Sequence, residues 1–242
     1  LTNSLADRIV PNSLAVYESF TRWERLLIDD DDVRIIPNGV DLDRIDQADQ
    51  SNYDLHAAFD IPPESVIVGT ASMITEQKAY DVLVDAINRA NDRSDIRLDL
   101  VITGDGPLRA DIEALVTQLE IDEYIHFAGL VDRETVYKIL TEIDIYAMPS
   151  RWEGFSNAAV EALGASNPCV FSDIDPFVIP YRDVALFHTV DDCDELATQL
   201  VAFADNPEHR ERYAQRGRQL VEEKYTLERI AGEYAELYRE LI

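Results

Sequence analysis

The stretch SRWEGFSNAAVEALGASNPCVF, residues 150–171, is the part of the sequence that decides the fold. An Ala-rich helical pattern, Asn157–Ala165, separates the end of one apolar run from a second that begins at Pro168. Gly154 stands in the turn before this helix, and Gly164 closes its Ala-rich part. A strand, a helix and a second strand in close succession predict a parallel βαβ unit.

Apolar runs alternate with amphipathic helical patterns through most of the chain. The runs are continuous, and most are followed by a helical pattern, which is typical of a parallel sheet buried on both faces. The predicted strands are Ser65–Ser72, Leu98–Gly104, Ile125–Val131, Ile143–Pro149, Pro168–Ser172 and Ala185–Val190. The predicted helices between them are Tyr80–Asn91, Leu108–Leu119, Arg133–Thr141 and Asn157–Ala165. The pattern predicts an α/β fold with a doubly wound, Rossmann-like parallel sheet.

The two ends of the chain differ from this pattern. Residues 6–13 are predicted to form a short strand that continues into a helix to about Leu27, and we expect this piece to complete the sheet of another domain. From Cys193 onward three helices are expected, with breaks near Asn206 and Tyr225 and with Thr226 as the N-cap of the last. The predicted domains are residues 1–38, a domain end and linker; 39–225, the Rossmann-like domain; and 226–242, a C-terminal crossover helix.

The chain is strongly acidic, with 21 Lys and Arg against 48 Asp and Glu and a formal net charge of −27. The acidic residues are spread along the whole chain. Their mutual repulsion would be screened near 1 M salt, where the Debye length is about 3 Å, so we favour adaptation to a high-salt cytoplasm. An acidic partner-binding face is the alternative. Nucleic acid and anionic membranes are not expected as partners.

Other composition features restrict the location and the cofactors. No apolar run is long enough to span a membrane, and no basic-then-apolar leader is present. We expect a cytoplasmic protein, with the inner face of the membrane as the alternative and membrane association only through a domain missing from this chain. The two cysteines, Cys169 and Cys193, and the four histidines show no metal-ligand spacing. The triplets Asp41–Asp43 and Asp173–Asp175 resemble an Asp-x-Asp metal motif, but several such triplets arise by chance at this Asp frequency, so no metal ion is expected.

Ligands of open α/β sheets bind at the carboxyl ends of the strands. Candidate residues follow four predicted strands: Lys78, Gly106, Val131, and the turn Gly154, Phe155 and Ser156. The amides of this turn lie at a predicted helix start, where free N–H groups and the helix dipole favour an anion such as phosphate. Lys78 could instead be an ordinary exposed lysine, and Gly106 a simple turn glycine.

Two carboxylates flank this helix start. Glu153 precedes the turn, and Glu161 lies about 7 Å along the helix axis at about 1.5 Å per residue. Carboxylates accept hydrogen bonds from hydroxyls, so the pair suits a nucleotide-sugar, with one acid for the transferred sugar and one for the ribose. The same spacing at Glu134–Glu142 and Glu228–Glu236 is interpreted as solvated helix faces.

These motifs resemble the donor-binding, C-terminal domain of the family 4 glycosyltransferases, the glycosyl transferases group 1, which have the GT-B architecture. The most specific similarity is the E-x7-E motif with its flanking Gly-Phe, Glu-Ala and Pro-x-Val. Similar segments follow one another along nearly the whole chain: VRIIPNGVD (33–41), GDGPLRADIEAL (104–115), IHFAGLV (125–131) and residues 143–173. The segment ADRIVPNS (6–13) resembles the last strand of the family's acceptor domain.

The resemblance implies transfer of a sugar from a nucleotide-diphosphate sugar to a hydroxyl acceptor with retention of configuration and without a metal or other cofactor. Glu153 and Lys78 would be the catalytic residues, the first at the donor sugar and the second at the leaving diphosphate. The implied donor-binding residues are Gly106, Val131, Gly154, Phe155, Ser156 and Glu161, with Glu161 on the ribose. A glycan or a lipid-linked sugar is the class of acceptor considered.

Two positions depart from the family pattern. Met73 stands where the family has an arginine, and Asp175-Pro176-Phe177 replaces a Gly-Gly pair. Arg151 is the candidate to replace the missing cation. We expect this chain alone to bind a nucleotide-sugar weakly and to transfer little. The alternatives are another GT-B enzyme, such as a sugar-nucleotide epimerase, and a non-catalytic nucleotide-sugar-binding module.

Overall fold

The computed structural model describes residues 6–26, 28–51 and 53–241. Its centre is a parallel sheet of β1 (Val66–Ala71), β2 (Leu98–Thr103), β3 (Ile125–Gly129), β4 (Ile145–Met148), β5 (Cys169–Ser172) and β6 (Ala185–His188). The strand order is β3-β2-β1-β4-β5-β6, and every neighbouring pair is parallel. The predicted doubly wound fold is confirmed, and the predicted strand ends differ by two residues at most.

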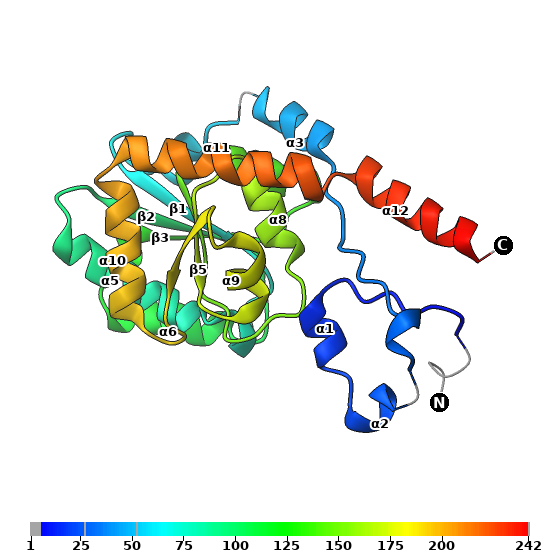
Figure 1. The fold of residues 1–242 in the computed structure, drawn as a ribbon. Helices are drawn as coiled ribbons and strands as arrows, with labels where there is room; N and C mark the ends of the chain where they lie inside the picture. Colours follow the sequence, from blue (N-terminus) through cyan, green and yellow to red (C-terminus); the bar gives the residue numbers. More distant parts are fainter. Residues whose placement is uncertain (1–5, 27, 52, 242) are drawn as a thin grey trace.

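Helices cover both faces of the sheet (Figure 1). One face packs on α5 (Tyr80–Arg93), α6 (Arg109–Gln118) and α10 (Cys193–Ala204). The other face packs on α3 (Leu42–Asp49), α7 (Arg133–Glu142), α8 (Asn157–Gly164) and α11 (Pro207–Lys224). Val68 belongs to the first core and its neighbour Ile67 to the second, because successive strand residues point to opposite faces. Continuous apolar strands are therefore required.

Three short helices were not predicted: α3, α4 (Leu55–Phe59) and α9 (Asp175–Tyr181). Asp41 caps α3 by accepting a hydrogen bond from the Arg44 amide at 3.1 Å. In α9, Phe177 is buried and stacks on Phe171, with ring centroids 4.7 Å apart. The residues that replace the Gly-Gly pair thus start a helix and add a core side chain.

The leading segment, residues 6–26, differs from its predicted structure. In place of one continuous helix there are two, α1 (Leu14–Glu18) and α2 (Arg22–Arg25), and the expected end near Leu27 lies outside the described residues. The break arises because Thr21 is extended and forms a capping box with Glu24, which starts a new helix. The predicted strand at residues 6–13 is not formed: the structure has only an isolated parallel bridge between Ile9 and Val33 there.

The last helix, α12 (Leu227–Glu240), projects from the sheet body toward the leading segment (Figure 1). The predicted breaks after α10 and α11 are confirmed, and the Thr226 side chain caps α12. Ile230 and Leu237 pack on the buried Ile36 of the connecting segment. This small cluster joins the C-terminal helix to the connection that follows the leading segment.

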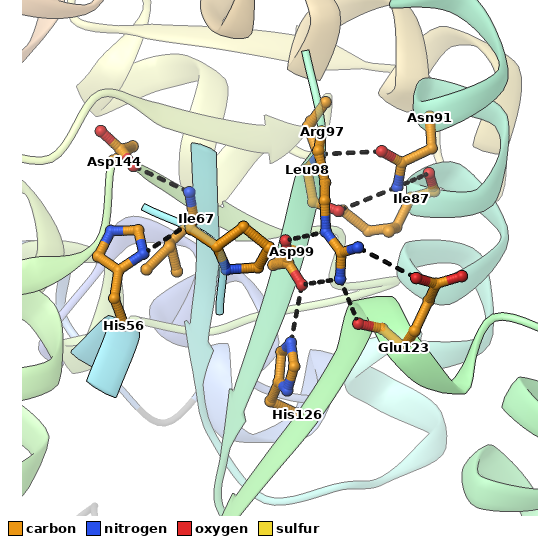
Figure 2. Close-up of polar contacts among 11 residues, drawn as sticks. His56, Ile67, Ile87, Asn91, Arg97, Leu98, Asp99, Glu123, His126 and Asp144 are labelled. Atoms are coloured by element: carbon orange, nitrogen blue, oxygen red, sulfur yellow. Dashed lines mark hydrogen bonds and ion pairs between the residues drawn. The ribbon is translucent and has the colours of Figure 1, made fainter. Parts of the chain in front are cut away.

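A polar network lies at the amino ends of β2 and β3, opposite the edge where ligands are expected. Figure 2 shows the carboxylate of Asp99 between Arg97 and His126. Arg97 donates to both oxygens, at 2.8 and 3.1 Å, and the Nε2 atom of His126 lies 2.8 Å from Oδ1. Asp99 is 0% exposed, so this is a paired, buried carboxylate. Such a charge is tolerated only because its partners satisfy it.

The excess of acid predicts a stability that rises with salt. The 21 Lys and Arg residues cannot neutralise 48 acidic ones, and Arg151 already lies between Asp81 and Asp191. Raising KCl from about 0.1 M to about 1 M shortens the Debye length from about 10 Å to about 3 Å. The midpoint of urea unfolding should therefore increase over this range. Sucrose at matched osmolality is the control, and an unchanged or falling midpoint in KCl would contradict the prediction.

Candidate functional site

The order of the strands places the candidate site between β1 and β4. The direction of winding reverses there, and ligands of doubly wound sheets bind in the crevice outside these carboxyl ends. Lys78 ends the short 3₁₀ helix Glu76–Lys78 after β1, and Glu153 follows β4. The Nζ atom of Lys78 forms an ion pair with Oε1 of Glu153, whose side chain is 6% exposed. The two predicted catalytic residues are therefore in contact.

Two further side chains hold the Glu153 carboxylate. Gln77 Nε2 donates to Oε2 at 3.2 Å and to the Trp152 carbonyl oxygen at 2.9 Å. Ser150 Oγ donates to Glu153 Oε1 at 2.9 Å. These residues were not singled out in the sequence, although each lies within three positions of a candidate. The loops after β1 and β4 are thus joined through Glu153, which is fixed by three donors.

The turn before α8 presents free backbone amides. Among the described residues, the N–H groups of Gly154, Phe155 and Ser156 donate to no protein acceptor. The Ser156 side chain is the N-cap of α8, accepting from the Ala159 amide at 3.2 Å, and its hydroxyl donates to Met148 Sδ at 3.3 Å. Its hydroxyl is therefore used within the protein, while the amides remain available for an anion.

The leading segment packs against this turn. Ser13 Oγ donates to the Gly154 carbonyl oxygen at 2.7 Å. A Cβ atom on Gly154 would lie 2.8 Å from Cγ2 of Val16, too close for a side chain at this position. A larger residue at position 154 would therefore need Val16 to shift, so glycine permits the close approach of α1.

Glu161 contacts a different cation from Glu153. Its side chain lies in α8 and is 9% exposed, and Oε1 forms an ion pair with Arg133, the first residue of α7. Burial raises the pKa of Glu161, and the positive charge and hydrogen bond of Arg133 oppose this increase. The structure thus brings Lys78 to Glu153 and Arg133 to Glu161. Arg133 was not predicted as a site residue, because only the folded chain brings α7 and α8 together.

The two remaining candidates lie on neighbouring loops. A Cβ atom on Gly106 would be 2.3 Å from the carbonyl oxygen of Ile74, so this glycine lets the loops after β1 and β2 touch. The Ile74 amide also donates to the Asp105 carbonyl oxygen at 3.0 Å. The contact supports the turn interpretation of Gly106. Val131 is half-buried and packs against the core beneath α7 and α8.

The structure also shows the surroundings of Met73, which departs from the family pattern, and of Arg151, the candidate replacement cation. Met73 is exposed in the loop after β1. Arg151 donates to Asp81 and Asp191, both at 2.7 Å, and to the Glu76 carbonyl oxygen. Because these acceptors already compensate its charge, the contacts argue against Arg151 as a replacement for the missing arginine.

Comparisons with known proteins show the family to which the chain belongs. The family model for glycosyl transferases group 1 matches residues 64–206. A phosphatidyl-myo-inositol mannosyltransferase of Mycobacterium leprae is 31% identical over 229 residues, 93% of this chain and 58% of the relative. An MMP alpha-(1->4)-mannosyltransferase of Mycolicibacterium hassiacum is 28% identical over 181 residues, 73% of this chain and 43% of the relative. The chain belongs to the glycosyl transferases group 1 family.

Solved structures show the same fold at low identity. The HepE protein of Anabaena, solved with UDP and glucose, has a TM-score of 0.85 at 16% identity over 99% of this chain and 65% of its own. A sucrose-phosphate synthase of Thermosynechococcus elongatus has a TM-score of 0.81 at 22% identity, over 98% of this chain and 59% of its own. The chain spans 58% and 43% of the length of the two mannosyltransferases named above. No helix among the residues described here has the length and apolar character to cross a membrane.

Proposed function

We propose that this chain is the donor-binding part of a retaining glycosyltransferase, which moves a sugar from a nucleoside-diphosphate sugar to a hydroxyl acceptor. The observation that carries the proposal is the contact of Lys78 with Glu153 at the switch point of the sheet. The free amides of Gly154 to Ser156 follow directly after this pair. A cation, hydroxyl-accepting carboxylates and anion-binding amides are the groups that an activated sugar requires.

Each group has a distinct role in the proposed reaction. Lys78 neutralises the charge that develops on the leaving diphosphate, and the free amides of the turn hold phosphate oxygens. Glu153 accepts hydrogen bonds from the transferred sugar, and Glu161 from the ribose. Catalysis rests on positioning and charge stabilisation, and the proposal assigns no metal ion or other cofactor. When the donor enters, its phosphates share Lys78 with Glu153.

The relatives support the class of donor and leave the acceptor open. The Anabaena protein has been solved with UDP and with UDP-glucose, which supports a nucleotide-sugar donor for this chain. The proposed acceptor is a hydroxyl of a glycan or of a lipid-linked sugar. Because the relatives are longer, we propose that this chain alone binds the donor weakly and transfers little sugar. The proposed location is a high-salt cytoplasm.

One observation favours a second function. Met73 is exposed where the family resemblance places a cation, and no arginine occurs between Gly69 and Lys78. A module that binds a nucleotide-sugar without catalysis needs less charge at the diphosphate. Retention of a transferred sugar on a hydroxyl acceptor, assayed with the complete protein, distinguishes the transferase both from this module and from a sugar-nucleotide epimerase.

The proposed function predicts a loss of nucleotide affinity when Glu161 is changed. Calorimetry in about 1 M KCl with UDP and GDP as probes should show binding to the wild type. Glu161→Ala should bind about 10- to 100-fold more weakly, since a hydrogen bond to a charged group contributes about 1.5–3 kcal/mol. Glu228→Ala, from a spacing-matched pair on α12, is the control and should bind like the wild type. Unchanged binding by Glu161→Ala would contradict the proposed function.

A further inference from the structure

The ion pair of Arg133 and Glu161 joins an exposed cation to a buried acid. The Arg133 side chain is 56% exposed, whereas that of Glu161 is 9% exposed. Within the described ranges, Arg133 is the one Lys, Arg or His side chain at ion-pair distance from Glu161. The negative charge of Glu161, the proposed partner of the ribose, is thus balanced by a single residue from another helix.

Although exposed, the Arg133 guanidinium is held in place. Its Nε atom donates to the hydroxyl of Tyr137 at 3.0 Å, and its Cζ atom lies 5.3 Å from the centre of the Tyr137 ring. Tyr137 is buried and belongs to the core that also contains α8 residues. Asp132 fixes the start of α7 by accepting from the Thr135 amide at 2.8 Å. Arg133 therefore approaches Glu161 from a defined position.

This arrangement has a consequence for ribose recognition. A carboxylate can accept hydrogen bonds from two ribose hydroxyls, whereas a protonated acid has less acceptor capacity. A buried carboxyl without a cation tends to take up a proton. We propose that Arg133 is a positioning residue, which keeps Glu161 ionised and oriented to receive the ribose hydroxyls of the donor. The inference rests on the proposed function and deepens it.

The pKa of Glu161 gives the sign of the expected effect. Burial raises this pKa, and Arg133 acts against the increase. Removing Arg133 must therefore raise the pKa further. Affinity for ribose is lost as the pH falls through this pKa, so the variant should lose affinity at a higher pH than the wild type does.

Several charged groups lie on the helices and strands packed around this pair. The charged and titratable groups on the elements packed around α7 and α8 include Asp43, Arg44, Asp46 and Asp49 on α3, Glu134, Tyr137, Lys138 and Glu142 on α7, Tyr146 on β4, Cys169 on β5, and Arg218 and Glu222 on α11. Burial raises the pKa of Tyr146 and of Cys169 well above their ordinary values, and arginine stays protonated. Burial also raises the pKa of Glu142 on α7, so the Glu161 carboxyl has to be followed through its own resonance.

The first experiment measures the Glu161 carboxyl directly. Side-chain ¹³C NMR titrations would be recorded for the wild type, Arg133→Ala, Arg133→Lys and Arg229→Ala, with Glu161→Gln identifying the resonance. In Arg133→Ala the Glu161 midpoint should rise by about 1–3 pH units, the range expected for loss of a nearby opposite charge. Arg133→Lys should restore most of the difference. Arg229, on α12 and paired with Glu233, makes the same change of net charge at a remote site and should leave the midpoint unchanged. An unmoved midpoint in Arg133→Ala overturns the proposal.

The second experiment links this midpoint to binding. Uridine is the probe, because it carries the ribose but no titrating phosphate. At pH values below the Glu161 midpoint of the variant, Arg133→Ala should lose about tenfold in uridine affinity per pH unit, since only the ionised fraction of Glu161 binds. At higher pH the variant should match the wild type. A loss that is equal at every pH would mean direct contact of Arg133 with the ligand, and no loss would mean a surface ion pair. Either result overturns the proposal.

The two proposals can fail separately. If the wild type binds neither uridine nor UDP, or if Glu161→Gln binds uridine as well as the wild type does, the ribose role of Glu161 fails. If Glu161→Gln loses uridine affinity while Arg133→Ala follows the wild type at every pH, only the role of Arg133 fails. Thermal unfolding of each variant confirms that the chain is folded in these measurements.

Discussion

Replacing Asp99 by alanine is expected to lower the free energy of unfolding by about 3–5 kcal/mol, the cost of removing one partner from a buried ion pair. Asp99 is fully buried at the amino end of β2 and accepts hydrogen bonds from Arg97. Its Oδ1 atom also contacts His126 (Figure 2). Without the carboxylate, these partly buried groups keep their places but lose their acceptor. Urea unfolding at pH 7 in about 1 M KCl measures the difference.

Asp194→Ala is the control for this prediction. Asp194 is 58% exposed and pairs with Arg89 at 2.9 Å, so the same substitution there should change stability by about 0–1 kcal/mol. Equal effects at positions 99 and 194 would contradict the argument from burial.

Asp99 also predicts how the stability of the protein depends on pH. Burial acts to raise the pKa of Asp99, but the hydrogen bonds from His126 and Arg97 outweigh it, so the pKa lies below the ordinary value. The stabilisation is therefore fully present above the unfolded pKa of about 3.9 and is lost as the pH falls through the folded value. Below about pH 4 the wild type should lose stability more steeply than Asp99→Ala. If the stabilities of the two proteins changed with pH in the same way, the pKa of Asp99 would not be lowered in the folded state.

The second large effect is expected at Lys78. Lys78→Met keeps most of the length of the side chain and removes the charge, which leaves Glu153 buried with Gln77 and Ser150 as its remaining partners. Stability should fall by about 2–3 kcal/mol, less than for an unsupported buried charge. Glu153→Gln in the Lys78→Met background should recover part of the loss, because the uncompensated negative charge is then gone. Urea unfolding of the four proteins gives the coupling energy, and a coupling near zero would mean that the ion pair is not formed in solution.

Binding adds a second measurement of the same residue. Lys78→Met should weaken UDP binding by about 10- to 100-fold, the value of a charge-assisted contact. It should leave uridine binding unchanged, because uridine has no phosphate. Equal losses for both ligands would indicate that the substitution disturbs the site as a whole.

The sequence predicted the parts of the fold that depend on local periodicity. The six strands and the helices α5 to α8 follow from long, continuous apolar or amphipathic patterns. The helix breaks near Asn206 and Tyr225 were predicted from turn residues. The short α3, α4 and α9 were missed because five to eight residues carry little periodicity. The prediction of one long helix in the leading segment was wrong, since the capping box at Thr21 starts a new helix within the apolar pattern around it.

The candidate site was predictable only in part. The strand ends and the Gly-Phe turn identify Lys78, Glu153 and the amides before α8, because topology alone brings these loops together. The contacts of Arg133 with Glu161 and of Gln77 with Glu153 join residues 28 and 76 positions apart. Spacing in the sequence does not encode such contacts. They depend on helix packing and on side-chain conformation.

The loops around the candidate site combine a fixed backbone with open side chains. Backbone hydrogen bonds and glycine contacts lock the loops after β1 and β2, while the side chains of Met73, Leu130 and Trp152 extend into solvent. Folding places few demands on these three positions. Substitutions at these three positions should therefore alter the surface around the candidate site with little effect on the free energy of unfolding.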